Sequence, residues 1–200
     1  RSREYKRPMC LTFIDLQNAF DSIEIEAVME ALDRQRVPTQ YIKVLRELYK
    51  NFTTKISPFY NDINIDVGRG IRHGDAISPK LFMATLQNVM QTLEWDNIGA
   101  KVDGRQIHHL RLADDIVLIT LDISQAERMR ADFDKVCGKV GLRLNLKNTM
   151  FIKNGFVSYA TFTLKGTNIS ECSSFVCLGR KINMMNDLAP ELSRRKRAAW

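Results

Sequence analysis

The sequence predicts an α+β domain in which an antiparallel sheet is backed by helices. Strand and helix candidates follow one another irregularly, without the regular alternation of a βαβ fold. The connections between them are short, and Asp103-Gly104 is a hairpin signal. With 200 residues, 44% of them hydrophobic, the chain can bury one sizeable core but not two full domains.

The first quarter of the chain predicts a buried strand followed by two helices. Residues 9–14 are almost wholly apolar, as in a strand buried on both faces, and the run ends at Asp15. Apolar positions at helical spacing predict a helix over residues 22–36. Pro38 should end that helix and open the next one.

A hairpin, a loop and a helix are expected next. Residues 53–67 contain two strand candidates with alternating apolar positions. Residues 68–75 form a loop rich in glycine and positive charge. Because serine caps helices and proline suits a first helical position, Ser78-Pro79 should start a helix.

The middle of the chain predicts a tight hairpin with two acidic residues at its tip. Apolar runs on both sides of Asp114-Asp115 favour this arrangement. Residues 124–127 match a capping box, so a helix should start there and end near Gly141. The remaining expected elements are short strands at 142–145, 150–153, 161–165 and 175–178, and a basic helix opened by Pro190.

Composition limits the function classes. A net charge of +7 suits a polyanionic partner, although many proteins that bind no nucleic acid share such an excess. No apolar run approaches the roughly 20 residues of a membrane span. The four cysteines form no CxxC pair, which argues against a structural zinc site.

The carboxylates carry the main chemical signal. Asp15 ends one buried strand, and Asp114 and Asp115 sit at the tip of a separate hairpin. Acidic side chains at strand ends can hold two Mg²⁺ ions on a rigid scaffold while one side stays open to phosphates. Taken as a bare dipeptide, Asp114-Asp115 favours an ordinary turn over a metal site, because aspartate is a common turn residue. The tandem pair His108-His109 should point to opposite sheet faces and so not share one metal.

Five segments, in order, resemble the catalytic motifs of LINE-type (non-LTR) reverse transcriptases. Together they cover the chain from about residue 12 to residue 182, and the basic tail resembles that of RTE-like elements. The five segments are 13–21 (FIDLQNAFD), 70–82 (GIRHGDAISPKLF), 112–118 (LADDIVL), 141–149 (GLRLNLKNT) and 177–179 (CLG). Two positions depart from the family pattern: His73 replaces the usual glutamine, and Leu112 replaces an aromatic residue.

The resemblance implies a polymerase palm with partial fingers and the start of a thumb. The implied divisions are 1–36 and 76–182 for the palm, 37–75 for partial fingers, and 183–200 for a truncated thumb. It also implies RNA-directed DNA polymerase activity in retrotransposition, with two Mg²⁺ ions, or Mn²⁺, as cofactors. The alternative is an inactive relic of a reverse transcriptase that only binds nucleic acid.

Site roles follow from the resemblance, residue by residue. Asp15 and Asp114 would bridge both metals, with Asp115 assisting. Phe20 would exclude a 2′-hydroxyl, although a single phenylalanine is more often part of the core. The further implied residues are Lys147 as proton donor to pyrophosphate, Arg72, His73 and Gly74 as nucleotide contacts, and Leu178 and Gly179 as primer contacts.

The implied partners are an RNA template, a DNA primer and deoxynucleoside triphosphates, with no membrane. The chain reads as a piece of a longer retrotransposon polyprotein that also carries an endonuclease. Such a protein is expected inside the cell, in cytoplasm and nucleus, as a ribonucleoprotein.

Overall fold

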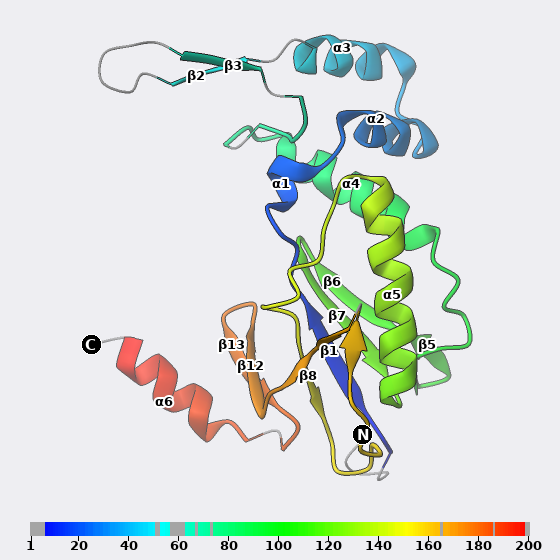
Figure 1. Ribbon diagram of the computed structural model, residues 1–200, viewed down its shortest axis with the longest axis vertical. Helices are drawn as coiled ribbons and strands as arrows, with labels where there is room; N and C mark the ends of the chain where they lie inside the picture. Colours follow the sequence, from blue (N-terminus) through cyan, green and yellow to red (C-terminus); the bar gives the residue numbers. More distant parts are fainter. Residues whose placement is uncertain are drawn as a thin grey trace. The chain divides into compact units, whose positions relative to one another are not determined.

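The computed structural model describes residues 7–50, 53–56, 63–66, 68–72, 74–164, 166–185 and 187–198 (Figure 1). His73, one of the predicted nucleotide contacts, lies outside these residues. The chain divides into two compact units, which are described separately. The first comprises Arg1–Leu16, Glu94–Asp132 and Leu144–Trp200, and the second comprises Gln17–Leu93 and Phe133–Arg143.

A five-stranded sheet in the order β11-β8-β1-β7-β6 forms the centre of the first unit (Figure 1). The strands are β1 (Cys10–Ile14), β6 (His109–Leu112), β7 (Asp115–Thr120), β8 (Met150–Lys153) and β11 (Ser170–Glu171). Strand β1 lies in the middle and pairs antiparallel with β7 and β8, as its apolar sequence predicts. The expected antiparallel sheet has one exception, because the two-residue edge strand β11 pairs parallel with β8.

Both faces of this sheet are covered. Alternation along β1 sends Cys10 to one face, where it packs with Ile123 and Ala126 of helix α5 (Ile123–Lys139). Phe13 points to the other face and packs with Phe175. Phe175 belongs to the hairpin formed by β12 (Ser174–Cys177) and β13 (Arg180–Asn183). The sheet is therefore the middle layer of the first unit.

The start of α5 corrects the predicted capping box at residues 124–127. Asp122 caps the helix instead, since its Oδ1 accepts a hydrogen bond of 2.7 Å from the backbone amide of Gln125. Glu127, which a capping box would turn back to the helix start, accepts bonds from the backbone amide and hydroxyl of Thr163. A long-range partner has replaced the local one.

The rest of the first unit consists of small elements. They are β4 (Ala100–Val102), β5 (Arg105–Ile107), β9 (Thr163–Leu164), β10 (Thr167–Asn168) and α6 (Ala189–Ala198). Asp103 and Gly104 form the β4–β5 turn, both with positive φ, which confirms the hairpin prediction. The strand expected over 142–145 is reduced to one bridge between Leu144 and Leu16.

The second unit is largely helical. Its elements are α1 (Ala19–Ser22), α2 (Ile25–Arg34), α3 (Thr39–Tyr49), β2 (Thr53–Ile56), β3 (Ile63–Asp66) and α4 (Ser78–Gln91). The predicted helix starts at Pro38 and Ser78-Pro79 are confirmed. The capping role expected for Ser78 is wrong, because Ser78 is the first residue of α4 and Ile77 is the N-cap, without a side-chain hydrogen bond. In the part of the chain that the structure describes, no helix combines the length and apolarity needed to cross a bilayer.

Candidate functional site

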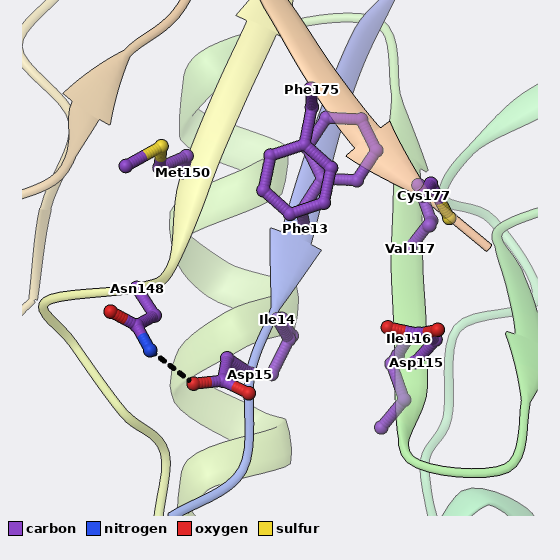
Figure 2. A pocket seen from close by; sticks show the side chains of 10 residues that line it. All are labelled: Phe13, Ile14, Asp15, Asp115, Ile116, Val117, Asn148, Met150, Phe175 and Cys177. Atoms are coloured by element: carbon purple, nitrogen blue, oxygen red, sulfur yellow. Dashed lines mark hydrogen bonds between the residues drawn. The ribbon is translucent and has the colours of Figure 1, made fainter. Parts of the chain in front are cut away.

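Strand register brings three polar residues to one end of the sheet in the first unit. β1 and β7 pair Ile14 with Ile116, so one further step places Asp15 opposite Asp115. Asn148 lies in the turn just before β8, and its side-chain nitrogen reaches the Asp15 carboxylate. Paired residues of neighbouring strands point to the same face. All three line a pocket of about 310 Å³ (Figure 2).

Asp114 lies in the tight turn between β6 and β7. Because Leu112 pairs with Asp115, only Ala113 and Asp114 remain for the turn. Ala113 has a φ of 53°, as the first position of a type II′ turn requires. An alanine there is strained, and such strain persists only where the surroundings impose it. The turn leaves Asp114 exposed beside Asp115.

Two amides hold the Asp15 carboxylate. The side-chain nitrogens of Asn145 and Asn148 each donate a 2.9 Å hydrogen bond to its Oδ2. Figure 2 shows the bond from Asn148. The backbone amide of Asn145 donates to the carbonyl of Asp15, and Thr149 closes the turn by donating to the carbonyl of Asn145. The Oδ1 atom of Asp15 accepts no hydrogen bond from a described residue. This oxygen is therefore available for a ligand.

The pocket has a concentration of negative charge. Partial desolvation raises the pKa of the Asp115 carboxyl, and the charges of Asp114 and Asp15 raise it further. Neighbouring negative charges of this kind attract a cation, which offsets their repulsion. Oxygen donors of this kind are the ligands that Mg²⁺ prefers.

The three aspartates fit a magnesium site in chemistry but are not a preassembled cage. Among the described residues, no group of three acidic, histidine or cysteine side chains is arranged to hold a metal ion. Asp15 and Asp115 line the pocket, whereas Asp114 does not. Magnesium usually takes one or two carboxylates and completes its shell with water and substrate phosphates. A site with few protein ligands and an open side is compatible with this coordination of magnesium.

An apolar wall closes one side of the pocket. The rings of Phe13 and Phe175 stack with their centroids 4.0 Å apart and an angle of 12° between the planes (Figure 2). Cys177, two residues beyond Phe175, also lines the pocket. Burial raises the pKa of the Cys177 thiol, and the Asp115 charge raises it further, so the thiol stays protonated. The β12–β13 hairpin is thus attached beside the carboxylates.

The tip of that hairpin carries the two predicted primer contacts. Leu178 and Gly179 form the turn, with φ values of 50° and 70°. Positive φ at both positions is the pattern of a type I′ turn, which suits glycine but is unusual for leucine. The Leu178 side chain is 57% exposed, so nothing in the core explains its place at the tip.

Lys147 lies in the exposed turn that holds Asp15, but it does not line the pocket. Its neighbour Asn148 points there instead. Asn145 and Asn148 are site residues that the sequence reasoning missed. The available signal was a turn of polar residues just before β8, the strand paired with β1.

Three predicted nucleotide contacts belong to the second unit. Phe20 is half-buried and stacks on Phe82 of α4, with centroids 4.9 Å apart. Arg72 donates a 2.7 Å hydrogen bond to the carbonyl of Leu48, near the end of α3. Gly74 has a φ of 80° and an exposed backbone with free space around it. Their roles toward a nucleotide stay predictions.

The expectation that His108 and His109 point to opposite faces is wrong. Their Nδ1 atoms lie 2.8 Å apart, and both rings contact Trp95 edge-on. His108 falls between β5 and β6, where strand alternation does not apply. Burial lowers the pKa of His109 to about 4, with further lowering by His108 and Arg111. His109 is therefore neutral at physiological pH, and one Nδ1 atom of the two rings donates a hydrogen to the other.

Solved structures with a similar arrangement show which fold this is. The telomerase of Candida tropicalis, solved with a fragment of telomeric RNA, matches 93% of this chain with a TM-score of 0.66 at 13% identity. This chain covers 30% of that telomerase chain. The telomerase of Candida albicans, also solved with telomeric RNA, matches 91% with a TM-score of 0.61 at 14% identity, and 31% of it is covered. The chain therefore has the same α+β fold as the matched part of these telomerase chains.

Sequence comparison identifies the family. Residues 2–180 match the family described as reverse transcriptase (RNA-dependent DNA polymerase). A transposon-derived protein of Caenorhabditis elegans is 36% identical over 50% of this chain and 37% of its own length. The Pol polyprotein of the retrotransposable element R2DM of Drosophila melanogaster is 24% identical over 98% of this chain, which spans 20% of that polyprotein. The R2 polyprotein of Nasonia vitripennis is 31% identical over 54% of the chain and 11% of its own length.

The chain belongs to the reverse transcriptase family, among the LINE-type retrotransposon proteins. It spans about a third or less of the length of these curated relatives.

Proposed function

We propose that this chain forms the catalytic palm of an RNA-directed DNA polymerase that adds deoxynucleotides to a primer 3′-hydroxyl. The observation that carries the proposal is the strand register that sets Asp15 opposite Asp115, with Asp114 in the adjoining turn. A structural domain would have no use for three like charges at one open end of a sheet, because they repel one another.

Asp15 and Asp114 would hold two divalent cations, with Asp115 assisting from the position opposite Asp15. When bound, such ions acidify the primer hydroxyl and neutralise the charge of the departing pyrophosphate. Asn145 and Asn148 would orient Asp15 by occupying Oδ2, which leaves Oδ1 for a cation. The stacked rings beside the pocket exclude water from one side of it.

The remaining roles extend the proposal beyond the pocket. Lys147 would protonate the leaving pyrophosphate. Phe20 would select deoxyribose, and Arg72 and Gly74 would contact the nucleotide, with His73 as a further contact outside the described residues. The tip of the β12–β13 hairpin would contact the primer strand.

The context of the relatives suggests partners for the whole protein. Their retrotransposon polyproteins favour an RNA template, a DNA primer and an accompanying endonuclease, acting as a ribonucleoprotein in cytoplasm and nucleus. The proposed palm divisions, fingers over 37–75 and thumb over 183–200 belong to the same hypothesis.

Template-dependent incorporation by the complete protein tests the proposal. The assay uses an RNA template, a DNA primer, deoxynucleotides and Mg²⁺, with Asp15→Asn, Asp114→Asn and Asp115→Asn as variants. Each variant should lose more than about 100-fold in rate, as expected when electrostatic stabilisation of a transition state is removed. Asp96→Asn, an exposed carboxyl elsewhere in the same unit, is the matched control.

The outcomes separate copying from mere binding. Incorporation that survives the three substitutions would exclude the site. A wild-type protein that binds primer–template but incorporates nothing would be the inactive relic instead.

A further inference from the structure

A buried acidic residue lies outside both the pocket and the family match, which ends at residue 180. Glu191 is in the first turn of α6, and 4% of the residue is exposed. Its carboxylate accepts hydrogen bonds from Arg194 Nε at 2.9 Å, Arg194 Nη2 at 3.0 Å and Arg195 Nε at 2.6 Å. It also accepts one of 2.8 Å from the backbone amide of Lys181 in β13. Together these bonds lower the pKa of Glu191.

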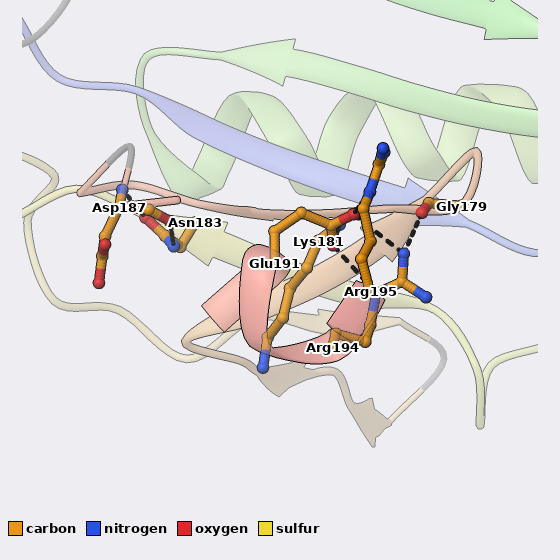
Figure 3. A network of polar contacts seen from close by, with 7 residues as sticks. All are labelled: Gly179, Lys181, Asn183, Asp187, Glu191, Arg194 and Arg195. Carbon is orange, nitrogen blue, oxygen red and sulfur yellow. Dashed lines mark hydrogen bonds and ion pairs between the residues drawn. The ribbon is translucent and has the colours of Figure 1, made fainter. Parts of the chain in front are cut away.

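This network fastens α6 to the tip of the β12–β13 hairpin. The bond from Lys181 links Glu191 to the strand itself, and Arg194 Nη2 donates to the carbonyl of Gly179 in the turn (Figure 3). One guanidinium therefore bridges the Glu191 carboxylate and the turn. Arginine suits such a bridge because its donors form a rigid fork.

The other strand of the same hairpin, β12, packs beside the pocket. Phe175 stacks on Phe13, two residues before Asp15, and Cys177 lines the pocket. The hairpin thus lies between the strands that carry the carboxylates and the helix that carries Glu191. Contacts of β12 with the central sheet and of β13 with α6 together fix the position of the exposed hairpin tip.

Glu191 also holds the guanidinium group of Arg195 in place at the surface. Arg195 uses its Nε for Glu191, and its side chain is 65% exposed. Its two terminal nitrogens donate no hydrogen bond to a described residue, so the fork is open to an external acceptor. Guanidinium forks match phosphate geometry, and a fork held in place loses less entropy on binding.

We propose that Glu191 is a positioning residue that holds the hairpin tip and Arg195 as one preorganised surface for the phosphate backbone of the primer strand. Glu191 acts through Arg194 and Arg195 and does not touch the substrate itself. The proposal rests on the polymerase function proposed above. A helix-stabilising role alone would not predict an effect on primer binding.

The test measures primer–template affinity and turnover separately in the complete protein. Glu191→Ala should raise Kd and KM for primer–template about tenfold, which corresponds to about 1.4 kcal/mol. The kcat at saturating primer–template should change less than about twofold, because the carboxylate pocket is untouched. Glu191→Gln keeps the shape of the side chain but not its charge. Its Kd for primer–template should lie between the values of the wild type and of Glu191→Ala.

A second variant covers the case in which Glu191→Ala does not fold. Arg194→Lys keeps the charge next to Glu191, but its single ammonium cannot form the fork that bridges Glu191 and Gly179. It should raise Kd about threefold to fivefold, less than loss of the whole network. Arg197→Ala, a charge removal on the same helix, is the control and should have a smaller effect.

Each outcome decides between the two proposals. Unchanged Kd in both Glu191→Ala and Arg194→Lys, or an equal rise in Arg197→Ala, would overturn the positioning role. A wild-type protein that binds primer–template with this Glu191 dependence but incorporates nothing would retain the positioning role and reject the polymerase function.

Discussion

Replacing Asp115 with asparagine should make the protein more stable when no divalent cation is present. Asp15 directly follows β1, and extending the pairing of β1 with β7 by one residue places it opposite Asp115, a position at which Cβ atoms lie about 5 Å apart. Two unit charges at that distance repel by about 3 kcal/mol at an effective dielectric constant of 20. Because Asp115 is exposed, solvent screening reduces this to about 1 kcal/mol.

The raised pKa of Asp115 gives the pH dependence of this effect. The folded state binds a proton at Asp115 more tightly than the unfolded chain does, so ionised Asp115 destabilises the fold at neutral pH. The penalty should disappear as the pH falls through the raised pKa. The stabilising effect of Asp115→Asn should therefore be present at pH 7 and vanish in acid.

Denaturant unfolding measures the charge repulsion in EDTA and the stabilisation by the cation in Mg²⁺. In EDTA the variant should gain about 1 kcal/mol over the wild type. Mg²⁺ at ten times its Kd should stabilise the wild type by about 1.4 kcal/mol and the variant by less than half of that. Asp96→Asn should match the wild type in both buffers. A variant less stable in EDTA would show that Asp15 and Asp115 do not repel each other, and equal stabilisation by Mg²⁺ would show that Asp115 does not help to bind the cation.

Three further substitutions test other parts of the account. Asn148→Ala removes one of the two amides that hold Asp15, so the Mg²⁺ concentration for half-maximal incorporation should rise about tenfold; an unchanged Mg²⁺ dependence would remove the orienting role. Phe20→Ala should let ribonucleotides be incorporated, measured as the ratio of kcat/KM for the two sugars, whereas unchanged discrimination would leave Phe20 as a core partner of Phe82. Phe175→Leu removes the ring stack on the sheet and should cost about 1 kcal/mol in the free energy of unfolding; a neutral result would show that the hairpin is held by its other contacts.

The fold was predictable where the local pattern and the tertiary structure agree. The apolar run ending at Asp15 became the central strand, and Pro38 and Ser78-Pro79 marked helix boundaries correctly. The capping box at 124–127 failed because Glu127 found a distant partner in Thr163. A sequence pattern reports local alternatives only, and here a long-range bond was available.

The candidate site was predictable from its acidic residues but not from their support. Asp15 and the Asp114-Asp115 pair stood out because charge interrupts apolar runs there. The amides of Asn145 and Asn148 did not, because their role depends on the register between β1 and β8, which is a tertiary property. The orientation of His108 could not be predicted either, because the sequence does not show that this residue lies between β5 and β6 and outside both strands.

Location of bound cations is the most direct test of the central claim. Crystals of the complete protein with Mn²⁺, primer–template and a non-reactive nucleotide analogue would give anomalous peaks at the metal positions. We expect peaks about 2.1 Å from the carboxylate oxygens of Asp15 and Asp114, with Asp115 close by. Ordered nucleotide with Mn²⁺ held only by residues away from these carboxylates would contradict it.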